Sequence, residues 1–109
     1  MQYDSIDGLD KKISKLIMGN DNQTDFDEAS KLWDHWIEVG GNAFDNAHIY
    51  GGGSMETLLG KWHRKRENLN DLVIIAKGAH TPNCDPKSLS QQLTESLDRL
   101  QIETADIYI

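Results

Sequence analysis

The chain has 109 residues, of which 38% are hydrophobic and 27% are charged, a composition that predicts one folded, soluble domain and leaves no room for a second core. Its formal charge of −7 and its pI near 4.9 disfavour nucleic acid and membrane surfaces as partners, because both are anionic. The single cysteine, Cys84, and the lack of an apolar leader or a long apolar stretch indicate a chain that stays in the reducing cytoplasm.

Short apolar runs alternate with longer amphipathic segments from the start of the chain. Residues 13–18 (ISKLIM) are predicted to form a strand that ends at Gly19. A helix should follow with Thr24 as its N-cap and Gly40 at its end, because apolar residues then recur at three- and four-residue steps: Phe26, Ala29, Leu32, Trp33, Trp36 and Ile37. The next predicted strand covers residues 42–45.

The same alternation continues to the last residue. Ser54 is predicted to cap a second helix that ends near Glu67, and residues 72–77 (LVIIAK) resemble a strand buried on both faces. Asp85 followed by Pro86 is a strong helix start, and residues 105–109 (ADIYI) should form a further short strand. This order predicts an α/β fold with a parallel sheet, either a small open sheet or half of an eight-stranded barrel.

Three ionisable residues come where predicted strands end. Asp45 closes the second strand, Tyr50 follows in its loop, and Lys77 closes the third strand, which should be a neighbour of the second. A free phenol is a weak acid at neutral pH, but a buried ammonium nearby stabilises the phenolate and makes the phenol usable in acid–base catalysis. The three glycines after Tyr50 allow a sharp turn there.

Three segments carry a resemblance to a known family. FDNAHIYGGGSMETLLG, LVIIAKGAH and SLDRLQIETADIYI, in this order and spacing, resemble the aldo-keto reductases. The resemblance implies a (β/α)8 TIM-type barrel and reduction of aldehydes or ketones with NADPH, or with NADH. It makes Tyr50 the general acid that protonates the carbonyl oxygen, Lys77 the residue that tunes it, and Asp45 the partner of the lysine and of the cofactor ribose.

The resemblance also assigns cofactor contacts and shows where the chain departs from the family. Gly19 and Asn20 match positions near the nicotinamide, although MGNDN differs from the usual run there. The family's catalytic histidine follows the fourth strand and is missing from this chain, as are the four later strands. We therefore expect residues 1–109 to be the amino-terminal half of a longer barrel, inactive and prone to self-association when alone. The alternative is a non-catalytic half-barrel, or a nucleotide-sensing or scaffold subunit.

The histidines offer weaker candidates. His48 and His80 are candidates for the wall of the substrate pocket, where a small carbonyl compound would bind, with packing as the alternative for His48 and an exposed loop position for His80. His35 and His63 fall on helices and should be structural. No grouping of histidine, cysteine and acidic residues has the spacing of a metal site.

Overall fold

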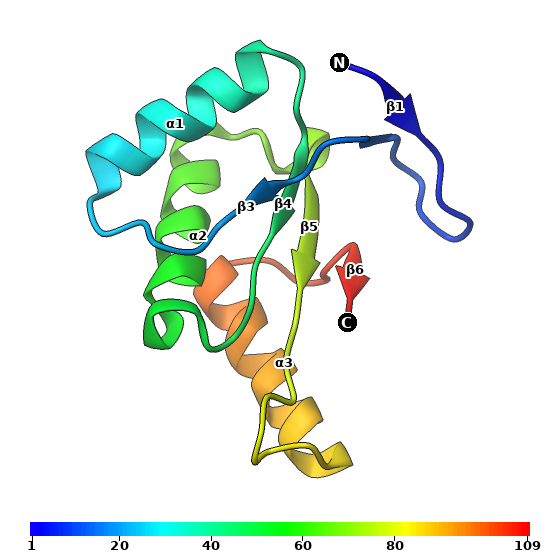
Figure 1. The fold of residues 1–109 in the computed structure, drawn as a ribbon, viewed down its shortest axis with the longest axis vertical. Coiled ribbons are helices and arrows are strands. Elements are labelled where there is room, and N and C mark those ends of the chain that lie inside the picture. Colours follow the sequence, from blue (N-terminus) through cyan, green and yellow to red (C-terminus); the bar gives the residue numbers. More distant parts are fainter.

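The computed structural model describes residues 1–109 as a four-stranded parallel sheet covered by three helices (Figure 1). The strands of the parallel sheet are β3 (Met18–Gly19), β4 (Ala43–Asp45), β5 (Val73–Ala76) and β6 (Ile107–Tyr108). The helices are α1 (Phe26–Glu38), α2 (Ser54–Arg66) and α3 (Pro86–Leu100), and short 3-10 turns cover Tyr50–Gly53 and Leu69–Asp71. None of the three helices has the length and the apolar composition of a membrane-spanning segment.

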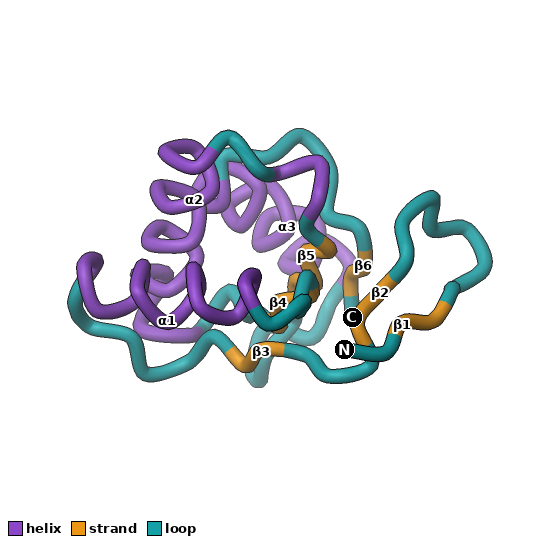
Figure 2. The backbone as a smooth tube through the Cα atoms, turned by 90° about the horizontal axis from the view of Figure 1, so that it is seen from above, coloured by secondary structure: helices purple, strands orange, loops and turns teal.

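The strand order identifies the type of α/β fold. The strands follow one another in space as they do in the chain, β3-β4-β5-β6, and every pair is parallel. All three helices lie on the same side of this sheet (Figure 2). A doubly wound open sheet carries helices on both faces, whereas a barrel carries them only outside. The fold is therefore a segment of a (β/α) barrel, one of the two architectures that the strand order predicted and the one that the resemblance implied.

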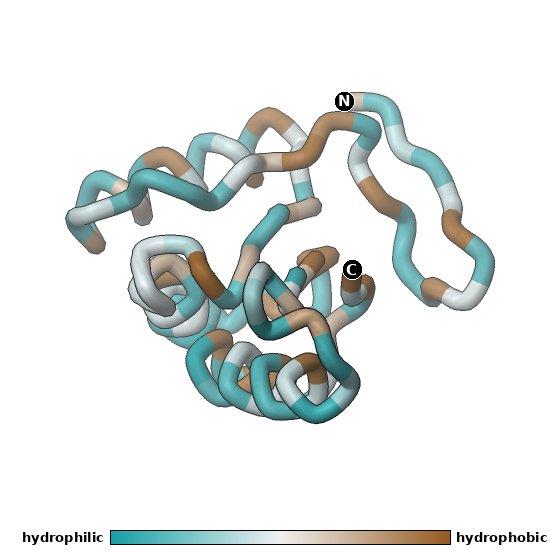
Figure 3. Tube along the Cα trace, turned by 60° about the horizontal axis from the view of Figure 1, so that its bottom comes forward, coloured by the Kyte–Doolittle hydropathy of each residue, from teal (hydrophilic) through white to brown (hydrophobic).

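The main core lies between the helices and the sheet. Trp33 of α1 and Trp62 of α2 are fully buried and meet edge to face with their ring centroids 5.5 Å apart. Phe44 of β4 completes this aromatic cluster, 5.5 Å from the ring of Trp62. Burial of large aromatic side chains is a dominant stabilising term in a domain of this size. Along the helices, hydrophobic residues alternate with hydrophilic ones (Figure 3), as expected when only one face of each helix contacts the core.

The predicted strand at residues 13–18 is wrong as one element. Its first part is β2 (Ile13–Ser14), which pairs in antiparallel fashion with β1 (Tyr3–Asp4), and only its last part belongs to the parallel sheet as β3. The chain bends between the two because the Ser14 hydroxyl donates to the carbonyl of Leu16 (2.7 Å). Ser14 is also tied to the start of β4, since its backbone N–H donates to Oδ1 of Asn42 (2.8 Å).

This β1–β2 hairpin packs against one end of the sheet face that has no helices. Ile13 forms a second buried cluster with Ala43, Val73 and Ile75, whose side chains point away from the helices. The Nζ atom of Lys11, in the hairpin loop, lies 3.0 Å from Oδ1 of Asp106 just before β6. The hairpin therefore closes the amino-terminal end of the sheet and leaves the opposite end open.

Two of the three predicted helix caps differ in the structure. Asp25, not Thr24, caps α1 by accepting a hydrogen bond from the N–H of Glu28, and a carboxylate caps at least as well as a threonine hydroxyl. The cap of α2 is Gly53, because its left-handed backbone (φ 103°) ends the preceding 3-10 turn, so Ser54 is already helical. Asp85 caps α3 as predicted.

Candidate active site

The alternation of side chains along the strands places Asp45 and Lys77 on the face that has no helices. Phe44 and Ile74 point toward the helices and belong to the main core, so their neighbours in the strands point the opposite way. Asp45 pairs in register with Ile75, and Lys77 follows two residues later on the same side. Both side chains therefore stand at the carboxyl ends of adjacent parallel strands.

The structure brings Asp45, Tyr50 and Lys77 together. The Lys77 ammonium donates to Oδ1 of Asp45 at 2.5 Å, a short charge-assisted hydrogen bond. The same nitrogen lies 4.9 Å from the centroid of the Tyr50 ring. The lysine therefore contacts both the carboxylate and the phenol, as their positions in the sequence suggested.

The charge state of Lys77 follows from these contacts. Burial disfavours the ammonium, but the hydrogen bond and charge of Asp45 and the neighbouring Tyr50 outweigh burial and raise the pKa of Lys77 above its ordinary value. Lys77 is thus a stable cation at neutral pH. A fixed positive charge beside a phenol is the arrangement that stabilises a phenolate.

The glycine turn that follows Tyr50 requires its glycines. Gly51, Gly52 and Gly53 all have positive φ angles, of 59°, 64° and 103°. Three successive positive φ angles are energetically unfavourable for residues that have a Cβ atom, and glycine avoids this strain. The turn reverses the chain immediately after Tyr50 and leads directly into α2.

A pocket of about 440 Å³ opens beside the tyrosine and the lysine. His48 and His80, the two histidines predicted to lie near the substrate, both contribute to its lining. The full lining is Ala47, His48, Ile49, Tyr50, Lys77, Gly78, His80 and Ile109. Half of these residues are hydrophobic, so the pocket suits a small molecule with an apolar part and one polar group.

The two predicted cofactor residues after β3 lie in different surroundings. Gly19 pairs with Asp45 across the sheet, is exposed, and has no atom within 4 Å of the position of a Cβ atom. Asn20 is fully buried on the other side, where its Nδ2 donates to Oδ1 of Asn46 (2.6 Å). The structure therefore places Gly19 next to Asp45, whereas the side chain of Asn20 points away from Asp45, Tyr50 and Lys77.

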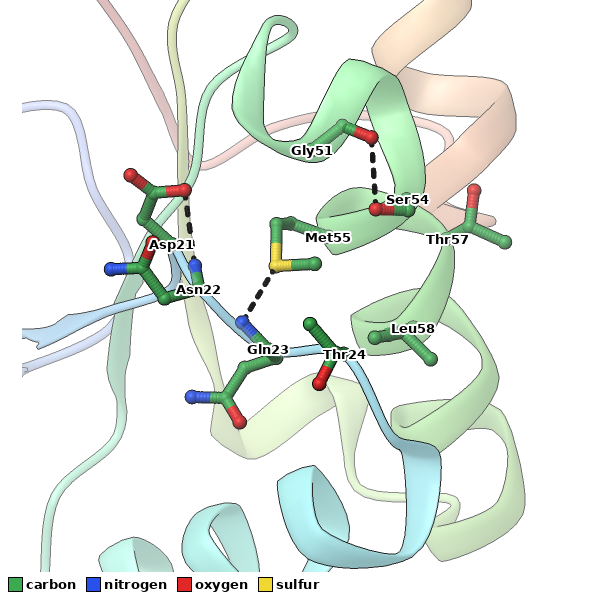
Figure 4. Close-up of a pocket in the computed structure, with 9 residues that line it drawn as sticks. All are labelled: Asp21, Asn22, Gln23, Thr24, Gly51, Ser54, Met55, Thr57 and Leu58. Atoms are coloured by element: carbon green, nitrogen blue, oxygen red, sulfur yellow. Dashed lines mark hydrogen bonds between the residues drawn. The ribbon is translucent and has the colours of Figure 1, made fainter.

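A larger cavity of about 770 Å³ lies between the loop after β3 and the start of α2 (Figure 4). Its lining is Asp21, Asn22, Gln23, Thr24, Gly51, Ser54, Met55, Thr57 and Leu58. The backbone N–H of Gln23 contacts Sδ of Met55 at 3.1 Å and joins the two walls (Figure 4). Only one residue that lines this larger cavity, Asp21, is ionisable. The groups suited to acid–base chemistry therefore line the smaller pocket.

Sequence reasoning missed a second polar cluster behind the Tyr50 turn. Glu95 and Arg99 of α3 contact His48, and Glu56 of α2 is fully buried beside them. Burial raises the pKa of Glu56 above its ordinary value, although Ser96 and Arg99 favour its charged form. The regular leucines of α3 predicted a helix, but nothing in that pattern indicated that its polar residues reach the Tyr50 loop.

Known proteins resemble this chain in sequence over most of its length. The profile of the aldo/keto reductase family matches residues 15–109. The aldo-keto reductase str7 of Strobilurus tenacellus is 33% identical over an 85-position alignment that covers 75% of this chain and 25% of that protein. A probable voltage-gated potassium channel subunit beta of Oryza sativa subsp. japonica is 30% identical over a 123-position alignment that covers 98% of this chain and 36% of that protein.

A solved structure shows the same relationship in three dimensions. The aldo-keto reductase AKR11C1 from Bacillus halodurans superposes with a TM-score of 0.81 at 25% identity and covers 99% of this chain. This chain spans 39% of that structure, so it corresponds to part of the barrel. With a family match over nearly its whole length, the chain belongs to the aldo/keto reductase family.

Proposed function

We propose that residues 1–109 supply the first four strands of a reductase barrel that reduces aldehydes or ketones with NADPH, or with NADH. The observation that carries this proposal is the contact of one lysine with both an acid and a phenol at the open end of the sheet. The Lys77 ammonium is 2.5 Å from Asp45 and 4.9 Å from the centroid of the Tyr50 ring. Membership of a family of oxidoreductases supports the same chemistry.

Each of the three residues has a distinct role in the proposed reaction. Tyr50 gives its phenolic proton to the carbonyl oxygen of the substrate, which becomes an alcohol. Lys77 stabilises the phenolate left on Tyr50, because a positive charge near a developing anion is worth most in a partly buried site. Asp45 keeps Lys77 charged and aimed at the ring. The nicotinamide cofactor supplies the hydride when it is bound.

The free face of the sheet fits the nicotinamide end of the cofactor beside these residues. Gly19 is open to its surroundings and lies opposite Asp45 in the register of β3 and β4. A flat ring and a ribose need such a space next to a hydrogen-bond acceptor. Gly19 and Asp45 would therefore contact the cofactor, with His48 and His80 lining the space for the substrate.

A second function is favoured by one comparison. The rice relative that matches 98% of this chain is described as a channel subunit, so the fold can be kept in a protein that assembles with others. This chain would then belong to a subunit that binds a nucleotide without turning over a carbonyl compound. Turnover distinguishes the two functions, since both predict a bound cofactor.

The test uses the protein extended beyond Ile109 to the roughly 250 residues of a full barrel. We expect NADPH oxidation that depends on an added aldehyde, and we expect Tyr50→Phe to slow it by about 100-fold or more, because the general acid is lost. Binding of NADPH, measured by fluorescence titration, should change little in this variant.

Tyr3→Phe is the matched control, because it removes the same hydroxyl from a tyrosine of β1 that donates to the carbonyl of Gly40 and is not part of the pocket lining. It should leave the rate unchanged. NADPH binding with no turnover of any simple aldehyde would support the subunit function. Equal rates in wild type and Tyr50→Phe would contradict the role of Tyr50.

A further inference from the structure

The peptide group of His48, two residues before Tyr50, is held on both sides. Its N–H donates to the carbonyl of Lys77 at 2.9 Å, which continues the pairing of β4 with β5 beyond the last strand residues. Its carbonyl accepts a hydrogen bond of 2.9 Å from Nη1 of Arg99, at the end of α3. The loop that carries Tyr50 is therefore fixed between the catalytic lysine's own backbone and a guanidinium group.

The imidazole of His48 is anchored to the same helix. Its Nε2 lies 2.7 Å from Oε2 of Glu95, and that oxygen is 3.6 Å from Nη2 of Arg99. Glu95 and Arg99 are four residues apart, so they share one face of α3. The backbone and the side chain of His48 are thus bound by two residues of one helical turn.

The guanidinium of Arg99 also sets the shape of the glycine turn. A Cβ atom at Gly53 would lie 2.5 Å from Cζ of Arg99, which means that the guanidinium packs directly against the backbone there. Behind it stands the fully buried Glu56, whose Oε1 is 3.5 Å from Nη1 of Arg99. The arginine therefore contacts the segment both before and after Tyr50.

The position of Arg99 is in turn fixed by close packing of α2 on α3. A Cβ atom at Gly60 would lie 2.5 Å from the carbonyl oxygen of Arg99, so the two helices touch through their backbones. One turn later, Nε2 of His63 donates to the carbonyl of Leu100 at 2.6 Å. The guanidinium is held at a defined place relative to the start of α2, where the Tyr50 turn ends.

From these contacts we propose that Arg99 is a positioning residue, which holds the Tyr50 loop so that the phenol stays beside Lys77. The proposal rests on the proposed reductase function. Arg99 lies outside the pocket lining and so acts only through the loop. Its planar group bonds a carbonyl and faces two carboxylates at once, an arrangement that suits the rigid fork of donors on a guanidinium better than the single point charge of a lysine.

The physical consequence is a loss of geometry rather than a loss of chemical groups. Without Arg99 the His48 carbonyl has no partner from α3, and a hollow replaces the packing surface of Gly53. The turn could then move by a fraction of an ångström relative to Lys77. Displacements of about 1 Å in a catalytic group cost up to about 100-fold in rate.

The experiment compares variants of the extended, cofactor-binding protein. Arg99→Met alone leaves the buried Glu56 without a counter-charge and can fail to fold. The double variant Arg99→Met/Glu56→Gln removes both charges, and a thermal melt checks that it folds. Arg66→Met is the matched control, because Arg66 forms an ion pair with Asp34 (2.6 Å) and has no contact with the loop.

We expect kcat of the double variant to fall by about 10- to 100-fold, with no change in NADPH affinity. Amide hydrogen exchange at Tyr50 and Gly52 should accelerate by about tenfold or more, because their N–H groups bond only within the loop. Arg66→Met should change neither quantity. A folded double variant with unchanged kcat and unchanged exchange would overturn the proposal.

The exchange measurement separates this proposal from the reductase function. If the wild-type protein turns over no carbonyl compound, the reductase function fails, and exchange at Tyr50 and Gly52 alone decides whether Arg99 fixes the loop. If the wild type is active and exchange rises without any fall in kcat, Arg99 orders the loop but does not position Tyr50, which also overturns the proposal.

Discussion

At the scale of single residues, two carboxylates near the pocket have opposite environments. Asp45 is partly exposed and bound to the Lys77 ammonium at 2.5 Å. Glu56 is fully buried, and its Oε2 has no hydrogen-bond partner. A buried carboxylate is stable only when its partners offset the loss of water, and at Glu56 burial outweighs Ser96 and Arg99. Asp45 therefore suits a charged role, whereas the charged form of Glu56 lowers the stability of the fold.

Glu56→Gln is expected to stabilise the fold at neutral pH by about 1 kcal/mol, because it removes a buried charge and keeps the shape of the side chain. The sign follows from the pKa of Glu56, which is raised in the folded state. The contribution of this pKa difference to stability is fully present below the ordinary pKa of a glutamate, and it is lost as the pH rises through the pKa of the folded state. Urea unfolding of wild type and Glu56→Gln across this range measures the difference.

The two stabilities should converge in acid, where Glu56 is protonated in both the folded and unfolded chains. Because other acids titrate in the same range, only the difference between the variants is informative. A Glu56→Gln protein that is less stable than wild type at neutral pH would show that the contacts with Arg99 and Ser96 outweigh burial.

Residue-scale prediction from the sequence succeeded where a side chain is placed by strand geometry. Asp45 and Lys77 come at the ends of adjacent parallel strands, so their contact follows from the fold class. Arg99 and Glu95 were not predicted, because their contacts with His48 join residues about 50 positions apart in sequence through the packing of α3. The buried amide of Asn20 was also unforeseen, since one residue of strand offset decides which face it occupies.

At the scale of elements, helices were predictable and the short strands were less so. The period of apolar residues located α1, α2 and α3 within one or two residues, because each buries one face over at least three turns. The strand at residues 13–18 was predicted as one element, yet a side-chain hydrogen bond of Ser14 divides it. The β1 strand, Tyr3–Asp4, is exposed and carries no apolar pattern that could have indicated it.

The seam between α2 and α3 depends on one glycine. Gly60→Ala should lower the free energy of unfolding by about 1–2 kcal/mol, although alanine is the better helix former by up to about 1 kcal/mol. The added methyl group would lie 2.5 Å from the backbone oxygen of Arg99, and a backbone cannot move aside as a side chain can. Denaturant unfolding of the two proteins tests the sign.

Gly19→Ala is the control for that change, because a Cβ atom there meets nothing within 4 Å and its φ angle is ordinary. It should leave stability unchanged or slightly increased. If Gly60→Ala were as stable as wild type, the two helices would have room to separate, and the packing that holds Arg99 in place would be looser than the structure shows.

At the scale of the whole molecule, the arrangement is one-sided. The helices cover one face of the sheet and the β1–β2 hairpin closes one end of the other, while β3 and β6 remain edge strands (Figure 1). Ile17 and Ile109, next to these two edge strands, are 46% and 70% exposed. Open edges with apolar residues beside them favour pairing with further strands. In the proposed barrel those strands would come from the rest of the protein.

The 109-residue chain by itself is therefore expected to self-associate, with a sedimentation coefficient that rises with protein concentration. Ile17→Lys combined with Ile109→Lys should reduce this association, because charges next to an edge strand oppose pairing. Val39→Lys is the control, since Val39 is similarly exposed (47%) but lies at the end of α1, away from both edges. In the extended protein, Ile17 should instead be covered by neighbouring strands, so Ile17→Lys should lower its melting temperature. A 109-residue chain that stays monomeric at every concentration would show that its edges are protected without further strands.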